Sequence, residues 1–418
     1  MEPKVLIGDD WSQDHHTICF MNPSTGGVAM TFDIPQTPEG FGRVCTERDK
    51  LEIRPQDCRV GIETAHNLIV DYYLDHQYQV FVIAPSVVKG CRKRFGASGA
   101  YTDESSAMLL ADLLRTDRAR FSPWRPHSPL IQQMLVQVRL IETLRREINR
   151  WTNRLEATLL RVNPYPLGLF NELECEISLQ FLLRYPTYEA VQALTLDGLK
   201  VFCREQHYTH PRRVPKLYAH LQIPTPPPSP AVAQAYADQV PFFAQTLLPL
   251  VQQRKQSLKA LRTLFVQHPD HPIFDSLPGA AKLLAPSLLV KFGDDRERFP
   301  TSKSVQTLAG TCPVTQQSGK YKGIYFRKAC DKEFRRILDQ FAWSSLNESV
   351  WAVTYHTQLQ QRGIVGSHAI RCLANRWLAI IWRLWQDRAP YDEGYHLQRR
   401  ALRHRPKPQD ARRLTIES

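Results

Sequence analysis

The first part of the chain alternates short apolar runs with turn residues, a pattern typical of a mixed α/β domain. Five apolar runs predict strands, at 4–12, 16–22, 27–35, 58–65 and 79–85. Helix-compatible segments lie at 38–52 and 67–77. The short connections between the first three strands suit antiparallel hairpins. Three antiparallel strands followed by helix, strand, helix and strand is the order of the RNase H-like fold, which we expect for residues 1–125.

The middle of the chain, residues 126–266, has the pattern of long helices. From Pro129 to Val162, apolar residues recur at three- and four-residue spacing with Arg and Glu between them. The segment 231–266 is the candidate partner, although Pro241 and Pro249 are expected to kink or split it. The stretch between them is broken by prolines and ends in a stiff spacer, PTPPPSP. The pair forms either a plain helical hairpin or a coiled-coil arm that sets the spacing of protomers.

The third region, residues 267–388, is expected to be α-helical, with one polar loop rich in Gly and Lys at 315–323. Residues 389–418 contain the run RRALRHRPKPQDARR and are expected to form a basic tail without regular structure. This tail either contacts phosphates or is only solvated. The fold class expected for the whole chain is therefore α/β followed by all-α.

The net charge of the chain indicates the kind of partner that it binds. The 418 residues include 54 Lys and Arg against 41 Asp and Glu, a formal net charge of +13. Such a surplus favours a polyanion, usually nucleic acid, although a generically basic protein remains the alternative. The nine cysteines are scattered without a CxxC pair, which fits a reducing cytosol. No run approaches the ~18 apolar residues of a membrane span, so we expect a soluble cytoplasmic protein.

Acidic residues stand at the ends of strands that the expected fold places side by side. The first strand ends in IGDD and the fourth in GIET, which brings Asp9 or Asp10 beside Glu63. Only one of the two aspartates faces the site, because side chains alternate along a strand. Asp103, at the start of the next long helix, adds a third carboxylate. Divalent ions would relieve the repulsion within this cluster and would promote phosphoryl transfer.

Each acid also has an ordinary structural interpretation. Glu63 could pair with His66, Asp10 could cap a turn, and Asp103 could be a helix N-cap supported by Ser106. The joint placement of the three acids at strand and helix ends favours a metal site.

Several motifs in fixed order extend this interpretation to nearly the whole chain. They are IGDDWSQDHH, VGIETAHN, GASGAYTDESSAMLLADLLRTDRARF, RWTNRLEATLLRVNPYPL, FLLRYPT, LPGAAKLLAPSLLVKFGDDRERFPTSKSVQTLAG, CPVTQQSGK and HAIRCLANRWLAIIWRLW. In these motifs the chain resembles the insertion-sequence "one-ten" family of DEDD transposases, which are bridge-RNA-guided recombinases. The resemblance implies a RuvC-like N-terminal domain, a coiled-coil-like middle and a C-terminal transposase domain that carries a serine.

The resemblance also assigns the acids. The family's first Asp corresponds to Asp10 and its Glu to Glu63. Its last two acids lie in a pattern that here reads YTDESSA, so Asp103 is retained and the fourth acid is replaced by Ser106. Helical geometry leaves no substitute, because Glu104 lies about 100° round the helix from Asp103 and Asp112 about 180°. Either three carboxylates suffice, or this protein is impaired in cutting DNA.

The serine of QQSGK, Ser318, is the nucleophile that the resemblance implies, and Mg²⁺ or Mn²⁺ held by Asp10, Glu63 and Asp103 is the implied cofactor. The implied partners are double-stranded DNA, a structured non-coding RNA and further copies of the chain, as a dimer or tetramer at the nucleoid. Basic residues near the two sites are candidates for nucleic-acid binding: Arg92, Lys93, Arg94, Lys320, Lys322, Arg327 and Lys328.

The expected function is cleavage and rejoining of DNA strands at insertion-sequence ends. Two alternatives stay open. One is a RuvC-like nuclease that uses water and forms no covalent intermediate. The other is a relic that binds nucleic acid without cutting it, which the replacement at Ser106 makes plausible.

Overall fold

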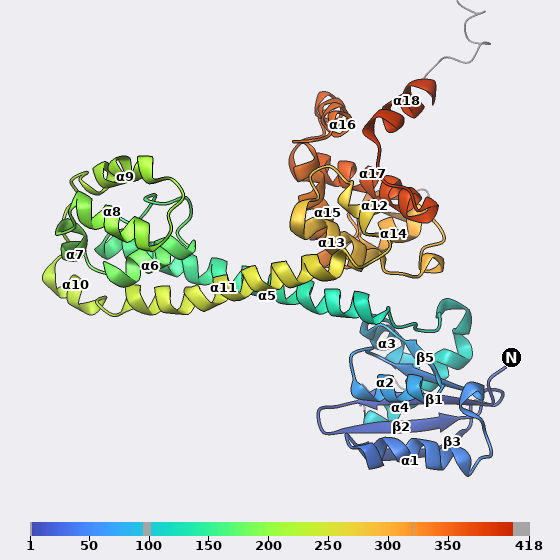
Figure 1. The fold of residues 1–418 in the computed structure, drawn as a ribbon. Helices are drawn as coiled ribbons and strands as arrows, with labels where there is room; N and C mark the ends of the chain where they lie inside the picture. Colours follow the sequence, from blue (N-terminus) through green and yellow to red (C-terminus); the bar gives the residue numbers. More distant parts are fainter. Residues whose placement is uncertain (1, 95–101, 320, 404–418) are drawn as a thin grey trace, which may run out of the picture. The chain divides into compact units, whose positions relative to one another are not determined.

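The computed structural model describes residues 2–94, 102–319 and 321–403, and the chain divides into two compact units at Pro126 and His127. The N-terminal unit holds a mixed five-stranded sheet in the order β3-β2-β1-β4-β5 (Figure 1). Its strands are β1 (Val5–Trp11), β2 (His15–Met21), β3 (Val28–Pro35), β4 (Cys58–Ile62) and β5 (Gln79–Val82). The first three pair antiparallel, whereas β4 is parallel to β1 and to β5. The strands and their directions confirm the sequence prediction.

Helices cover both faces of this sheet. They are α1 (Pro38–Asp49), α2 (Leu68–Asp75), α3 (Pro85–Cys91) and α4 (Asp103–Thr116). On one face, side chains of α1 and α2 pack on Ile7, Ile18 and Val60. On the other face, Leu110 and Leu113 of α4 join a second core with alternate residues of the same strands. The α/β region is therefore a three-layer structure, as strands with two buried faces require.

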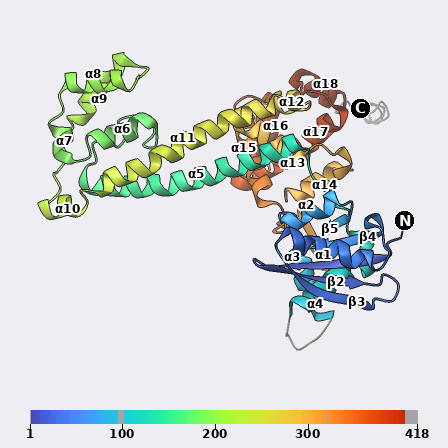
Figure 2. The same ribbon diagram turned by 60° about the horizontal axis from the view of Figure 1, so that its bottom comes forward.

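The second unit begins with a hairpin of two long helices. Helix α5 (Pro129–Val162) packs along α11 (Gln239–Phe265), and the two lie side by side in both Figure 1 and Figure 2. The predicted pairing of the two long helices is confirmed, but the second helix is interrupted before Pro241 and not at Pro249. A short α10 (Pro230–Ala235) precedes α11, which continues through Pro249. Pro241 lies in the first turn of α11, where a backbone N–H has no partner within the helix. Packing of Leu247 and Ala244 against α5 compensates for the hydrogen bond lost at Pro249.

The connection between the two long helices is a small helical subdomain, where the sequence indicated only a proline-broken spacer. It contains α6 (Glu176–Arg184), α7 (Tyr188–Gln192), α8 (Leu196–Glu205) and α9 (Val214–Leu221). Phe181, Phe202 and Leu199 are fully buried or nearly so in its core. The proline-rich connection is confined to residues 224–229, directly before α10.

The remaining helices follow α11, and all but the last contribute to a core that contains the fully buried Trp377 and Trp385. They are α12 (His271–Asp275), α13 (Ala281–Phe292), α14 (Ser302–Leu308), α15 (Lys332–Ser345), α16 (Val350–Gln361), α17 (Gly366–Asp387) and α18 (Glu393–Arg403). Helix α18 occupies part of the segment expected to be an irregular basic tail. Residues 404–418 of that tail lie outside the described residues.

One element of this region was predicted wrongly. The Gly- and Lys-rich segment at 315–323 belongs to an antiparallel hairpin of β6 (Val314–Ser318) and β7 (Tyr321–Tyr325), not to an irregular loop. Tyr321 and Tyr325 share one face of β7, Lys322 and Ile324 share the other, and Tyr and Ile are residues that favour strands. Within the described part of the chain, no helix is both long and apolar enough to cross a membrane.

Candidate active site

Asp9 and Asp10 are neighbours in β1, and the sheet gives them opposite environments. Asp9 is fully buried. His16 Nδ1 lies 2.8 Å from its Oδ1, and the Tyr73 hydroxyl donates to its Oδ2 at 2.9 Å. Burial and the adjacent Asp9 hold the pKa of Tyr73 well above its ordinary value, so its hydroxyl stays a donor. Asp9 is therefore a structural acid, and Asp10 points to the opposite face, on which α4 packs.

The register of β1 and β4 places Glu63 beside Asp10. Asp9 pairs with Ile62, the last residue of β4, so Asp10 is the next residue of β1 and Glu63 is the first residue after β4. One step earlier Gly8 pairs with Gly61. These glycines let α4 approach closely: a Cβ atom at Gly8 would stand 1.8 Å from the backbone oxygen of Ala107. The first turn of α4, with Asp103, thus lies over the end of β1.

The electrostatics of Asp10 are shaped by the acids near it. Partial burial is the largest of the causes that raise the pKa of Asp10 to about 6. The negative charges of Asp103 and then Glu63 are the next causes, and Asp9 adds a smaller effect. Arg92 acts in the opposite direction. Three acids from β1, the end of β4 and α4 therefore share one electrostatic environment.

Asp103 is not the N-cap of its helix, contrary to one interpretation of the sequence. Thr102 is the N-cap: its side chain accepts from the backbone N–H of Ser105, and the Ser105 hydroxyl completes the capping box. Asp103 is the first helical residue, and 64% of its side chain is exposed. Because another residue caps the helix, the Asp103 carboxylate is available for a different role.

His15 is a residue of this site that the sequence reasoning missed. Its Nε2 lies 3.5 Å from Asp103 Oδ2, and its Nδ1 lies 3.1 Å from the Ser12 hydroxyl. Ser12 also bonds the His15 backbone in the turn between β1 and β2. The signal in the sequence was the pair His15–His16 directly after the turn, where alternation sends one histidine to each face.

Ser106, which the resemblance aligns with the fourth acid of the family, lies one turn after Asp103 in α4. Ser106 is half-buried, and Glu104 is exposed. Asp112 does not replace the acid, because its Oδ1 forms an ion pair with Arg115 at 2.6 Å near the other end of α4. This agrees with the exclusion of Asp112 by helical geometry.

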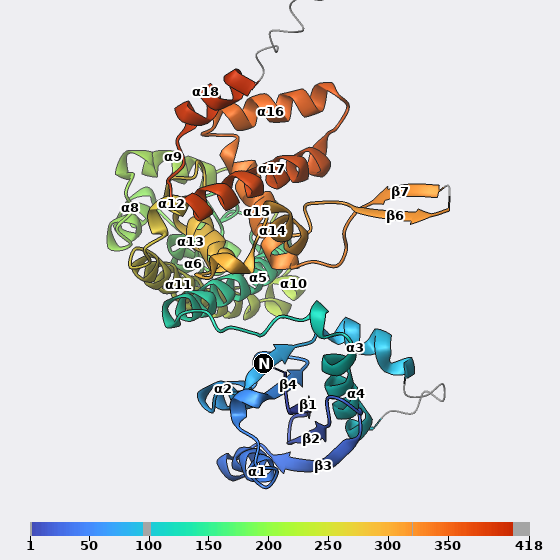
Figure 3. The same cartoon turned by 90° about the vertical axis from the view of Figure 1, so that its right-hand side faces the viewer.

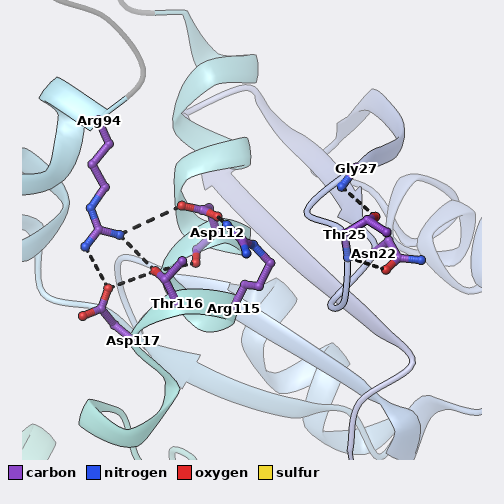
Figure 4. Close-up of polar contacts among 8 residues, drawn as sticks. All are labelled: Asn22, Thr25, Gly27, Arg94, Asp112, Arg115, Thr116 and Asp117. Atoms are coloured by element: carbon purple, nitrogen blue, oxygen red, sulfur yellow. Dashed lines mark hydrogen bonds and ion pairs between the residues drawn. The ribbon is translucent and has the colours of Figure 1, made fainter.

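Arg94, one of the candidate phosphate contacts, is held at the carboxyl end of α4 (Figure 4). Its guanidinium donates to Thr116 Oγ1 at 2.9 Å and to Asp117 Oδ2 at 3.0 Å. The Asp117 side chain also receives a hydrogen bond from Thr116. Arg94 therefore fixes the end of α3 against α4, while Arg92 is the cation whose charge reaches Asp10.

The donor set fits a hard divalent cation. Asp10, Glu63 and Asp103 supply carboxylate oxygens, the ligands that Mg²⁺ prefers, and their mutual repulsion is what such an ion would relieve. In residues 2–94, 102–319 and 321–403, no group of three His, Cys, Asp or Glu side chains is arranged to hold a metal ion. Ion binding would therefore require these carboxylates to turn toward one another.

Ser318 is the last residue of β6, at the exposed tip of the hairpin, and Figure 3 shows the hairpin standing away from the helices of its unit. Gly319 follows with φ of +56°, a left-handed conformation that favours glycine. Lys322 and Lys328 are exposed, and Arg327 Nε donates to the Cys312 backbone oxygen at 3.3 Å. Lys320 lies outside the described residues.

Comparison with known proteins identifies the class. Residues 7–164 match a DEDD-type transposase domain, and residues 271–357 match the model described as transposase IS116/IS110/IS902 family. A mini-circle putative transposase for IS117 from Streptomyces coelicolor is 25% identical over 398 residues, covering 93% of this chain and 95% of that protein. A 44.8 kDa protein of insertion element IS116 from Streptomyces clavuligerus is 21% identical, over 92% and 95% of the two chains.

Both matched domains are transposase domains: the first includes helix α5, and the second begins after helix α11. The chain is therefore a transposase, an enzyme that cleaves and rejoins DNA. Within that class it belongs to the IS110 family. The resemblance drawn from the sequence motifs is confirmed at the level of family and class.

Proposed function

We propose that this transposase cuts and rejoins DNA strands at insertion-sequence ends with two sets of residues. Asp10, Glu63 and Asp103 would hold Mg²⁺ or Mn²⁺, and Ser318 would attack the DNA. The observation that carries the proposal is geometric: Asp10 and Glu63 follow paired residues of adjacent strands, and α4, which begins with Asp103, packs closely on β1. The negative charges of Asp103 and Glu63 contribute to the raised pKa of Asp10. The strand order β3-β2-β1-β4-β5 supports an RNase H-like, RuvC-like domain as the carrier of this site.

The chemistry is a phosphoryl transfer through a covalent intermediate. The Ser318 oxygen forms a bond to a DNA phosphorus, and the bond from that phosphorus to the departing sugar oxygen breaks. The hydroxyl proton passes to solvent, and the departing oxygen takes up a proton. A strand hydroxyl reverses these steps to rejoin the DNA. Divalent ions would supply charge stabilisation at the reacting phosphate.

Ser318 and the acids belong to different units, so the reaction requires both units to meet on the DNA, within one protomer or between protomers. We propose a dimer or tetramer, because synapsis brings two DNA ends together. A structured non-coding RNA would choose the target, as the family implies. Lys322, Arg327 and Lys328 would neutralise phosphates near the serine.

A search for a protein–DNA adduct on denaturing gels tests the nucleophile. With labelled insertion-sequence ends and Mg²⁺, the native chain should form an adduct, whereas Ser318→Ala and Glu63→Gln should form none and still bind DNA. An adduct that persists in Ser318→Ala would refute the assignment of the serine. Cleavage to free ends without any adduct would favour the water-dependent nuclease.

Ser106 favours one further candidate, a transposase relic that binds but does not cut. An aspartate at this position would lie on the same helical face as Asp103. If the native chain neither cuts DNA nor forms an adduct, and Ser106→Asp restores both, the relic is the correct description. If the native chain cuts, three carboxylates suffice.

A further inference from the structure

The hairpin that carries Ser318 has two chemically different faces. Residues directly opposite each other in an antiparallel pair share a face. Ser318 lies opposite Tyr321, Gln316 opposite Gly323, and Val314 opposite Tyr325. These six residues form the serine face. The opposite face consists of Thr315, Gln317, Lys322 and Ile324.

Two tyrosines meet on the serine face. The hydroxyl groups of Tyr321 and Tyr325 are hydrogen-bonded to each other. They lie over Gly323, where a Cβ atom would stand 2.6 Å from Tyr325 Cε2 and 2.8 Å from the Tyr321 hydroxyl. The pair is nevertheless open to solvent, with Tyr321 59% and Tyr325 41% exposed. The missing side chain of Gly323 is what lets the two rings lean together.

The base of the hairpin is anchored to the helices of its unit. The guanidinium groups of Arg335 in α15 and Arg371 in α17 each lie 4.3 Å from the ring centroid of Phe326, the residue after β7. Arg335 also bonds the backbone oxygen of Arg327. These contacts fix the base of the β6–β7 hairpin. The hairpin can therefore hold the tyrosine pair in a constant position relative to Ser318.

We propose that the Tyr321–Tyr325 pair is a stacking surface for a nucleotide next to the phosphate that Ser318 attacks. Opposite residues of a hairpin have Cβ atoms about 5 Å apart, so the aromatic surface begins beside the serine hydroxyl. Aromatic rings accept any base on their faces. The pair seats the DNA strand so that the adjoining phosphate meets Ser318, and this inference rests on the proposed function of that serine.

Charge identifies the occupant as nucleic acid. Exposed Lys322 projects from the opposite face, and exposed Lys328 follows the hairpin. A DNA strand matches both the lysines and the tyrosine pair, because its phosphates can pair with the lysines and its bases can stack on the rings. A purely apolar partner would leave these positive charges without a counterpart.

The test uses the full chain with Ser318→Ala, so that binding is measured without reaction, and a single-stranded oligonucleotide carrying 2-aminopurine. Tyr321→Ala and Tyr325→Ala should each weaken binding about tenfold, whereas Tyr321→Phe should bind within about twofold of its parent. Ile324→Ala is the matched control, since Ile324 is 71% exposed on the same strand but faces the other way. An oligonucleotide made of abasic sites has no bases to stack, so the two tyrosine-to-alanine variants and their Ser318→Ala parent should bind it with equal affinity.

The inference is overturned if Tyr321→Phe loses as much affinity as Tyr321→Ala, if Ile324→Ala weakens binding equally, or if the loss persists on the abasic strand. Its failure is distinguishable from failure of the proposed function. Should Ser318→Ala still form the adduct while the tyrosine variants lose binding, stacking stands and the nucleophile is wrong. Should the serine prove essential while the tyrosine variants bind normally, only stacking fails.

Discussion

At the scale of single residues, Asp9 and Asp10 show that two aspartates adjacent in sequence can have different roles. Both lie near the carboxyl end of β1, yet Asp9 is enclosed by His16 and Tyr73, whereas the charges of Glu63 and Asp103 act on Asp10. Asp103 lies where a helix N-cap was one interpretation of the sequence, but Thr102 caps α4. The place of each acid in the fold, and not its residue type, sets its surroundings.

This crowding predicts a stability gain from Asp10→Asn. The folded-state pKa of about 6 lies above the ordinary 3.8, so the folded protein holds this proton more tightly than the unfolded chain. Ionisation of Asp10 therefore lowers stability as pH rises from about 4 to 6. Without metal, Asp10→Asn should be more stable at pH 7, on the order of 1 kcal/mol after allowance for solvent screening, and unchanged at pH 3.

Thermal denaturation at the two pH values, with and without Mg²⁺, measures this effect. Mg²⁺ should stabilise the native chain more than the variant, because the variant lacks one charged ligand. Asp14→Asn, at an exposed position beyond the end of the same strand, is the control. A gain from Asp10→Asn that is equal at both pH values would contradict the electrostatic explanation.

At the scale of elements, the position of α4 over β1 decides whether Asp103 reaches the other acids. Gly8→Ala would place a Cβ atom 1.8 Å from the Ala107 backbone oxygen, so α4 must move. We expect a loss of about 1–3 kcal/mol in the free energy of unfolding together with a loss of Mg²⁺-dependent cleavage.

Chemical denaturation followed by circular dichroism checks the first expectation, and the adduct assay checks the second. Gly42→Ala is the matched control, because Gly42 lies in α1 and a Cβ atom there would meet nothing within 4 Å. It should be neutral or stabilising by about 0.5–1 kcal/mol. Equal stability and activity of Gly8→Ala and the native chain would show that the close approach is not required.

Two elements departed from the sequence prediction for identifiable reasons. Glycine and lysine in the segment at 315–323 indicated a loop, but cross-strand pairing with β7 made it a hairpin. Pro249 was expected to break a helix, but burial along α5 outweighs one missing hydrogen bond. In the hairpin, pairing with the neighbouring strand overrode residue preference, and at Pro249 packing against a segment distant in sequence did so.

At the scale of the whole molecule, the net charge of +13 predicts salt-sensitive binding to nucleic acid. The logarithm of the binding constant should fall linearly with the logarithm of the salt concentration, by a slope of about 0.9 for each phosphate neutralised. Lys322→Gln and Lys328→Gln should each make this slope shallower by about one phosphate contact. Binding titrations over a range of salt concentrations measure it.

The matched control is Lys200→Gln, which removes the same charge from a lysine already paired with Asp197 at 2.8 Å in the helical subdomain. Its slope should equal that of the native chain. If all three variants shift the slope equally, net charge alone governs binding, and the lysines near Ser318 have no particular part in it.

The sequence by itself determined the strands and helices of the N-terminal unit, the pair of long helices and the family, because apolar periodicity, turn residues and motif spacing are local properties of the chain. It also placed the acids at the ends of β1, β4 and α4. Only the tertiary structure decided that Asp10 and not Asp9 faces α4, that His15 joins Asp103, and that two tyrosines share a face with Ser318. The face on which a side chain lies depends on strand register and on packing between distant segments, which local pattern does not contain.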